Sequence, residues 1–441
     1  MEGTILIGVA GLVALVVLIA IRVPIAHSMI LVGGIGTAIL NGPDIVLAQL
    51  KNLAYSQFSI YDLSVVPMFV LMGYFASHSG LSRDLFRAAN AWVGWMRGGV
   101  AMAAIAACAG FGSVCGSSLA TASTMGQVAL PELRRLHYAP SLATGTLAAG
   151  GVLGILIPPS VVLIVYAIIV EANIVTMFAA ALIPGLIATA FFMITIWIYV
   201  SFRPEAGPKG DAVSREEFIA ATVGVIPVLC VFGLVIGGIY GGFFNPTPAA
   251  AIGVFLVAAY GAARGTIRWT QTRASLLSTA QTTGMIYLIL LGAELLKIFM
   301  SRGGVTQATA EMAANSGLGP YTVLAILIIA LIGLGCLMDS LSMILLVIPF
   351  FWPVISEFDF GMNVEDTKVW FGIIALIVVE LGLITPPVGM NVFVINSLAR
   401  DVPMSETFKG VMPFFLVELI RVTLIVAFPS ISLFLPHLLK G

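Results

Sequence analysis

The stretch GILIPPS at residues 154–160 has a counterpart in GLITPPV at residues 382–388, and these two segments decide how the chain folds. In each of them a short apolar run meets two consecutive prolines. A proline inside a helix removes a backbone donor and clashes with the preceding turn, so it kinks or breaks the helix. The sequence therefore predicts one broken helix over 141–169 and a second over 369–398.

The composition places these breaks in a membrane protein. Of the 441 residues, 60% are hydrophobic and 9% are charged, and the mean hydropathy is +1.09. Soluble domains carry about 25% charged residues, so a water-soluble globular fold is excluded. The net charge of −1 leaves no basic patch for nucleic acid. Because one helical crossing needs about 20 apolar residues, we predict an all-α polytopic membrane protein with roughly ten to a dozen apolar segments.

The distribution of basic residues predicts how the chain crosses the membrane. Cytoplasmic loops collect Lys and Arg. The linkers 202–217 and 264–275 are both basic, whereas 241–247 between them is uncharged. Most of the other basic residues fall on the cytoplasmic face only if the segments 99–131 and 319–355 each enter and leave on one face. We therefore predict two re-entrant helical hairpins, the first from the cytoplasm and the second from outside, with both termini periplasmic.

The two halves of the chain present their elements in the same order, which predicts an inverted repeat. In the two hairpins, GSVCGSSL at 112–119 is similar to GCLMDSLS at 335–342. Hairpins that enter from opposite faces relate the halves by a two-fold axis in the membrane plane, an arrangement found in transporters. We predict a first repeat over 1–201, a cytoplasmic linker over 202–217 and a second repeat over 218–441.

The broken helices also predict binding sites. Backbone carbonyls that lose their helical partners are costly in hydrocarbon unless they line protein or a wet cavity. Sodium ions can satisfy such oxygens, and the hairpin tips add hydroxyl groups. The half-helices that begin near Ser160 and Gly389 point their positive ends inward, where a carboxylate would be held. We therefore expect two cation sites flanking one anion site.

At these motifs the chain resembles the large membrane subunit of tripartite ATP-independent periplasmic (TRAP) transporters. The segments that carry the resemblance are GSVCGSSLATASTMG at 112–126, PEL at 131–133, AAGGVLGILIPPS at 148–160, MDSLSM at 338–343 and GLITPPVGMN at 382–391. The resemblance implies an elevator-type secondary transporter of the bacterial inner membrane, driven by a sodium gradient. It also implies two protein partners, a small four-helix membrane subunit and a periplasmic protein that delivers an organic acid such as a C4-dicarboxylate or a sialic acid.

Carried over residue by residue, the resemblance implies three groups of site residues. The first sodium site would be formed by Ser113, Ser117, Ser118, Gly154 and Pro159. The second would be formed by Gly335, Asp339, Ser340, Gly382 and Thr385. The candidates for substrate contact are Ser123, Thr124, Ser160 and Asn391. Whether each residue binds through its side chain or its carbonyl stays open, and so does the identity of the organic acid.

Several alternatives remain at this point. Asp339 is either a cation ligand or the N-cap of a hairpin helix, where Asp is preferred. Glu380 either assists the nearby cation or contacts the surrounding scaffold. An autonomous sodium-coupled anion symporter of related architecture is the alternative function. An intramembrane hydrolase would need a nucleophile activated by a base, and no such arrangement occurs, so we predict no enzyme activity, no catalytic residue and no cofactor other than sodium.

Two basic stretches that contain tryptophan, Arg83–Arg97 and Arg264–Arg273, predict helices lying at the inner membrane surface, where they would contact lipid. A surface for docking a partner is the competing interpretation.

Overall fold

The helices of the computed structural model begin and end where the sequence offers caps and breakers. The structure describes residues 2–315 and 317–440, so the outermost residues 1 and 441 of the predicted repeats lie outside the described part. Four helices begin at a proline, Pro43, Pro140, Pro246 and Pro320. A proline fits the first turn because its missing N–H would have no helical partner there. Side chains cap other helices at Ser117, Ser160, Asn173, Ser214, Asp339 and Asn363.

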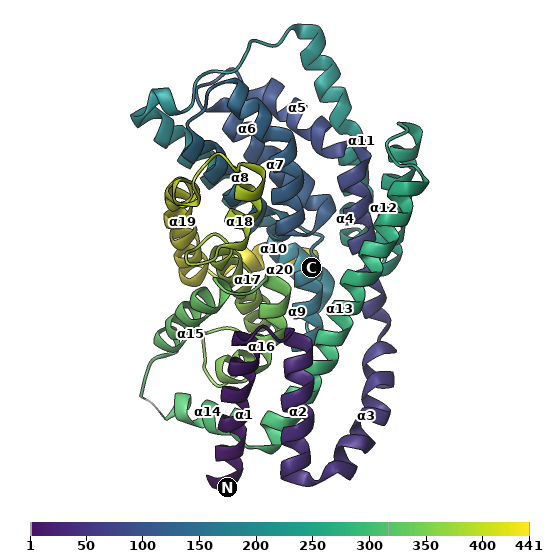
Figure 1. Ribbon diagram of the computed structural model, residues 1–441, viewed down its shortest axis with the longest axis vertical. Helices are drawn as coiled ribbons and strands as arrows, with labels where there is room; N and C mark the ends of the chain where they lie inside the picture. Colours follow the sequence, from purple (N-terminus) through teal and green to yellow (C-terminus); the bar gives the residue numbers. More distant parts are fainter. Residues whose placement is uncertain (1, 316, 441) are drawn as a thin grey trace.

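The helices form two groups that differ in their contacts (Figure 1). We call the first group the arm helices: α1 (Glu2–Ala20), α2 (Ile25–Asn41), α3 (Pro43–Phe58), α4 (Val65–Ser79), α5 (Leu81–Val93), α11 (Arg215–Tyr240), α12 (Pro246–Ala263), α13 (Trp269–Arg302) and α14 (Val305–Ala314). Among them α13 packs against α2 and α4, α12 packs against α4, and α11 packs against α5. In Figure 1, α3, α11, α12 and α13 follow the right-hand side of the molecule.

We call the second group the core helices: α6 (Gly99–Cys115), α7 (Ser118–Arg135), α8 (Pro140–Leu156), α9 (Val161–Val170), α10 (Ile174–Phe202), α15 (Pro320–Gly335), α16 (Ser340–Ser356), α17 (Val364–Gly382), α18 (Met390–Leu398), α19 (Met404–Ala427) and α20 (Ser430–Lys440). The helix α8 lies among α6, α7 and α19, and nearly all of its residues are buried. The helix α17 is buried to a similar extent. The two helices that precede the proline pairs therefore form the centre of the core group.

Each of the two segments predicted to form a hairpin folds as two consecutive helices that pack against each other, whereas their re-entry into the membrane stays a prediction. The outer ends of α6 and α7 meet the same linker, because Gly98 N donates to Gly207 O and Ala139 N donates to Ala206 O, each at 2.9 Å. The outer ends of α15 and α16 also lie together, with the rings of Tyr321 and Phe360 5.6 Å apart. The segments 99–131 and 319–355 thus turn back on themselves, and α7 continues to Arg135.

Both proline pairs interrupt a helix, as predicted. The pair Pro158-Pro159 separates α8 from α9, and the two helices are bent by 46°. The pair Pro386-Pro387 separates α17 from α18, and Gly389 takes a positive φ of 61° just before α18 begins. An L-residue with a side chain rarely adopts this conformation, so glycine suits the position.

Equivalent glycine contacts join each hairpin to its broken helix. A Cβ atom added to Gly112 on α6 would lie 2.7 Å from Gly154 Cα on α8. A Cβ atom added to Gly382 on α17 would lie 2.6 Å from Gly335 Cα on α15. Packing then crosses between the halves, since α7 contacts α18 and α16 contacts α9. Corresponding elements of the two halves therefore make corresponding contacts.

Some expected boundaries were wrong. The apolar run 52–79 is not one continuous helix, because α3 and α4 are separated by a short turn and bent by 62°. The basic stretch 264–273 forms no separate surface helix, since α13 begins at Trp269 and continues for 34 residues. The last apolar stretch of the chain, 411–435, is divided between α19 and α20. In the described ranges six helices are long and apolar enough to cross a membrane, or eight if each of two bent pairs counts as one span. The helices of the two predicted hairpins are not among them. Of these, α6, α15 and α16 have only 16 or 17 residues.

The other basic stretch, 83–97, contains the amphipathic helix α5, whose apolar face is buried against α6 and α11. Asp84 on α5 accepts a hydrogen bond at 2.8 Å from Tyr260 OH and pairs with Arg264. These contacts fasten α5 to the end of α12. The helix α5 is thus held to α12 within the arm group, and it also packs against α6 of the core group.

The crossing of α8 and α19 leaves no room for a side chain at Gly410. A Cβ atom there would lie 1.8 Å from Ser141 O. We predict that Gly410→Ala lowers the free energy of unfolding by ~1–3 kcal/mol, the usual cost of overpacking, measured as a lower Tm in detergent. Gly284→Ala on α13 is the control, because a Cβ atom added at Gly284 would have no other atom within 4 Å. Equal Tm values for the two variants would contradict this packing.

Candidate functional site

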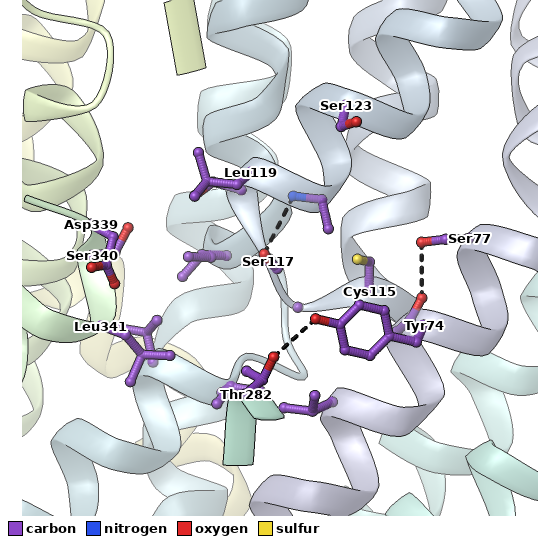
Figure 2. Close-up of a pocket in the computed structure, with 18 of the residues that line it drawn as sticks. Tyr74, Ser77, Cys115, Ser117, Leu119, Ser123, Thr282, Asp339, Ser340 and Leu341 are labelled. Carbon is purple, nitrogen blue, oxygen red and sulfur yellow. Dashed lines mark hydrogen bonds between the residues drawn. The ribbon is translucent and has the colours of Figure 1, made fainter. Parts of the chain in front are cut away.

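A cavity of about 330 Å³ lies where the arm helices meet the tips of both hairpins (Figure 2). The arm side is formed by α4 and α13, and the core side by the α6–α7 tip, the starts of α9 and α16, and Ile155 of α8. The polar residues that line the cavity are Tyr74, Ser77, Ser117, Ser118, Ser123, Thr124, Thr282, Asp339 and Ser340. Hydroxyl groups therefore dominate its polar surface.

The tip of the first hairpin brings together the residues expected at the first cation site. Gly116 takes a φ of +65° and ends α6, and Ser117 Oγ then accepts a hydrogen bond from Ala120 N at 3.4 Å to cap α7. A Cβ atom on Gly116 would lie 2.9 Å from Pro159 O. A Cβ atom on Gly154 would lie 2.7 Å from Ser117 O. The tip is therefore seated directly on the break between α8 and α9.

Ser113 lies one turn before that tip. Its Oγ donates to Gly110 O at 2.7 Å, and the side chain is buried within α6. Thr121, which sequence reasoning did not select, lies closer to the break, because a Cβ atom on Gly154 would lie 2.4 Å from its Oγ1. Within the described chain this buried Oγ1 has no hydrogen-bond partner. The unpartnered oxygen makes Thr121 a further candidate ligand.

The tip of the second hairpin has the same design with a carboxylate at the cap. Asp339 Oδ2 accepts a hydrogen bond from Ser342 N at 3.1 Å and so caps α16. Asp339 also lines the cavity, so both interpretations of this residue from the sequence remain compatible with its position. Gly335 and Gly382 are in backbone contact behind the tip. Thr385 Oγ1 donates to Leu381 O at 2.6 Å.

Glu380 connects the two tips. It lies on the last turn of α17 and is fully buried. Its Oε1 accepts a hydrogen bond from Ser340 Oγ at 2.5 Å, and a longer one from Ser118 Oγ at 3.4 Å. The two sets of residues expected to hold cations are therefore linked through one carboxylate oxygen. The sequence placed Glu380 near the second break, but it gave no sign of contact with the first hairpin.

The four substrate candidates do not share one surface. Ser123 and Thr124 line the cavity. Ser160 is fully buried, and its Oγ accepts from Leu163 N at 3.4 Å to cap α9. Asn391 is fully buried, and its Nδ2 donates to Ala148 O at 3.3 Å. Ser160 and Asn391 therefore do not line this cavity, although Asn391 Oδ1 is buried without a hydrogen-bond partner among the described residues, and a role of the four residues in substrate contact stays a prediction.

The arm helices supply cavity residues that sequence reasoning missed. Tyr74 OH on α4 and Thr282 Oγ1 on α13 are 2.9 Å apart and hydrogen-bonded (Figure 2). Ser77 lies one turn after Tyr74, and its Oγ donates to Gly73 O. The only sequence feature that could have indicated these residues is their polarity within apolar segments, Tyr74 in one segment and Thr282 beside Thr283 in another. Without the pairing of α4 with α13, nothing in the sequence connects them.

The electrostatics of the cavity come from helix termini and from the acidic side chain of Asp339. The N-terminal ends of α7 and α16 both reach it, and helix N-termini carry a partial positive charge that favours anions. The expected half-helix end near Ser160 also reaches the cavity, through Val161 and Val162 at the start of α9, whereas no residue of α18 lines it. The described residues contain no group of three His, Cys, Asp or Glu side chains that could hold a metal ion. The donor set at the tips is hydroxyl, carbonyl and carboxylate oxygen.

Comparison with known proteins identifies the family. Residues 12–431 match the family described as the DctM component of tripartite ATP-independent periplasmic transporters. The chain belongs to the DctM family. It is thus a TRAP transporter large permease, a multi-pass membrane protein, and not an enzyme. This confirms the resemblance seen in the hairpin and Pro-Pro motifs.

Relatives of this DctM permease differ in the compound named for each. It is 34% identical over 409 residues to the C4-dicarboxylate TRAP transporter large permease protein DctM of Pseudomonas aeruginosa, covering 91% of this chain and 92% of that protein. It is 30% identical to the sialic acid TRAP transporter large permease protein SiaM of Vibrio cholerae, covering 86% and 87%. It is 27% identical to the isethionate TRAP transporter permease protein DctMQ of Oleidesulfovibrio alaskensis, covering 94% of this chain and 64% of that longer protein.

The fold of this DctM permease has a counterpart among solved structures. The YdaH transporter of Alcanivorax borkumensis matches with a TM-score of 0.62, covering 88% of both chains. The sequences are 14% identical, so the likeness concerns the arrangement of helices.

Asp339 offers a test that separates helix capping from charge. Replacing a capping Asp by Ala costs about 0.5–2 kcal/mol, whereas Asn caps equally well. We therefore predict that Asp339→Ala lowers the Tm of the detergent-solubilised protein and that Asp339→Asn leaves it close to the wild-type value. If Asn lowers the Tm as much as Ala does, the carboxylate charge rather than the cap holds this tip.

Proposed function

We propose that this permease uses a sodium gradient to take up an organic anion that a periplasmic binding protein delivers. The observation that carries the proposal is the cavity between the arm helices and the two hairpin tips, where the N-termini of α7 and α16 meet. Partial positive charge from two helix ends favours a carboxylate there. Ser123 and Thr124 are the hydroxyl groups placed to orient it. The named compounds of the relatives are organic anions, which fits this chemistry.

The residues at the tips fit sodium. The first set, Ser113, Ser117 and Ser118 with the backbone at Gly154 and Pro159, offers neutral oxygens around one break. The second set consists of Gly335, Asp339, Ser340, Gly382 and Thr385. Buried Thr121 Oγ1 has no partner among the residues described, which leaves one more oxygen available to a cation. Bound sodium would supply positive charge beside the anion.

We further propose that the core helices move as one body against the arm helices, as in an elevator. The repeated glycine contacts and the crossed packing of α7 with α18 and α16 with α9 support an inverted repeat over 1–201 and 218–441. The cavity lies between the two groups, so a movement of one group would change the face to which the cavity opens. Alternating access by rigid-body movement of one bundle against another is common in such folds.

Two partners follow from the family. A TRAP system implies a small permease subunit and a periplasmic substrate-binding protein, and the DctMQ relative is longer than this chain. We place the chain in the bacterial inner membrane with the linker 202–217 in the cytoplasm and both termini in the periplasm. Contacts support this grouping of loops: Arg135 pairs with Asp211 of the linker at 2.5 Å, and His437 lies 3.0 Å from Asp366 near the other face.

Reconstitution tests the function. We predict that liposomes containing this chain and its small subunit accumulate an organic acid only with an inward sodium gradient and the cognate binding protein. Uptake of radiolabelled substrate is the measurement, with potassium replacing sodium as the control. Sodium-driven uptake in the absence of any binding protein would instead favour an autonomous symporter.

The orientation has a separate test. We predict that single cysteines introduced in the loop 356–368 react with a membrane-impermeant thiol reagent added outside intact cells. Cysteines at 203–215 should react only after the membrane is opened, because that linker would face the cytoplasm. The opposite labelling pattern would invert the topology.

A further inference from the structure

The buried charges next to the hairpin tips do not balance. Arg421 and Glu418 on α19 are both 1% exposed and form an ion pair, and Arg421 Nη1 also donates to Pro184 O at 3.0 Å. Glu380 is fully buried and forms no salt bridge among the described residues, although the Arg421–Glu418 pair is close enough to act on it electrostatically. A buried charge in a membrane is costly unless it is paired. An ionised Glu380 would therefore need a positive charge from outside the described residues.

The hydrogen bonds of Glu380 also orient two hydroxyl groups. A serine hydroxyl has one proton to donate and two lone pairs that accept. Because Ser118 and Ser340 both donate to Glu380 Oε1, their lone pairs remain available on the sides away from the carboxylate. Both side chains lie at the cavity, and each is 4% exposed or less. The carboxylate thus fixes one hydroxyl in each of the two sets proposed to hold sodium.

The proposed ligands themselves provide little negative charge. Every member of the first set is neutral, and the second set contains only Asp339, whose carboxylate already accepts from the backbone of α16. Groups that hydrogen-bond to metal ligands orient them and tune affinity. Glu380 meets this description for both sets at once.

We propose that Glu380 is a positioning residue shared by the two cation sites, where it supplies their common counter-charge and orients Ser118 and Ser340. The inference rests on the proposed sodium coupling. It goes further, because it makes a residue outside both ligand sets the electrostatic link between the two hairpins. It requires the carboxylate to stay close to both tips, as its two hydrogen bonds show.

Thermal unfolding of the full-length chain in detergent tests the proposal without transport. Tm is measured while sodium replaces choline at constant ionic strength, for the wild type and Glu380→Gln. We expect the sodium concentration at half-maximal stabilisation to rise about ten- to one hundred-fold in the variant, as for other groups that support metal ligands. Without sodium, the variant should be at least as stable as the wild type, because an unpaired buried charge has been removed.

A role in structure alone gives a different result. If Glu380 only held the helices together, Glu380→Gln would lower Tm equally at all sodium concentrations and leave the midpoint unchanged, which would overturn the proposal. Glu294→Gln is the matched control, since Glu294 is a carboxylate on the long helix α13 paired with Lys297 at 3.8 Å. Its midpoint should equal that of the wild type. If Glu380→Gln does not fold, Glu380→Met replaces it, with the same expected shift and no amide to bury.

Combining variants tests whether the residue is shared. Ser118→Ala weakens the first set and Ser340→Ala weakens the second. We expect Glu380→Gln to raise the sodium midpoint further in both backgrounds. An effect in only one background would assign Glu380 to a single site and overturn the shared role. If sodium does not raise the Tm of the wild type at all, the proposed sodium coupling itself is refuted. If sodium raises the Tm of the wild type but the midpoint sodium concentration is unchanged in Glu380→Gln, only the role proposed for Glu380 is refuted.

Discussion

Backbone that leaves the helical hydrogen-bonding pattern inside a membrane must be covered by protein, and this constraint shapes the core of the molecule. Polar backbone groups cannot face lipid. Each break is therefore covered by a hairpin, and glycine allows the two backbones to touch, at Gly112 against Gly154 and at Gly335 against Gly382. The same contacts gather oxygen atoms at both tips. The site is thus a consequence of how the breaks are covered.

The cavity takes its character from this arrangement. Its core wall holds helix N-termini and hydroxyl groups, and its arm wall holds the hydrogen-bonded pair Tyr74 and Thr282. Because the cavity is lined by both the arm helices and the core helices, its shape depends on how these two groups are placed relative to each other. If the core helices move against the arm helices as proposed, rigid helices could expose one site to either side of the membrane. Glu380 adds a link within the core body, so the two tips would move together.

Much of the fold was predictable because its signals are local. The proline pairs, the glycine-rich tips and the lengths of the apolar runs each act within one segment, and both hairpins and both broken helices lie where they were expected. The errors arose where a signal was absent. No breaker near 59–60 announces the bend between α3 and α4, and the basic residues at 264–273 suggested a surface helix where the chain turns and starts α13.

The amino-acid sequence by itself determined that the chain spans a membrane, where its helices break, and which oxygen-bearing residues stand at the tips. Backbone preference and hydrophobicity suffice for these properties, since both are set by neighbouring residues. Only the tertiary structure decided that Glu380 meets Ser118, 262 residues away, that α4 and α13 close the cavity, and that Ser160 and Asn391 lie away from it. Such contacts depend on how distant helices cross, and the crossing is fixed by the packing of the whole bundle.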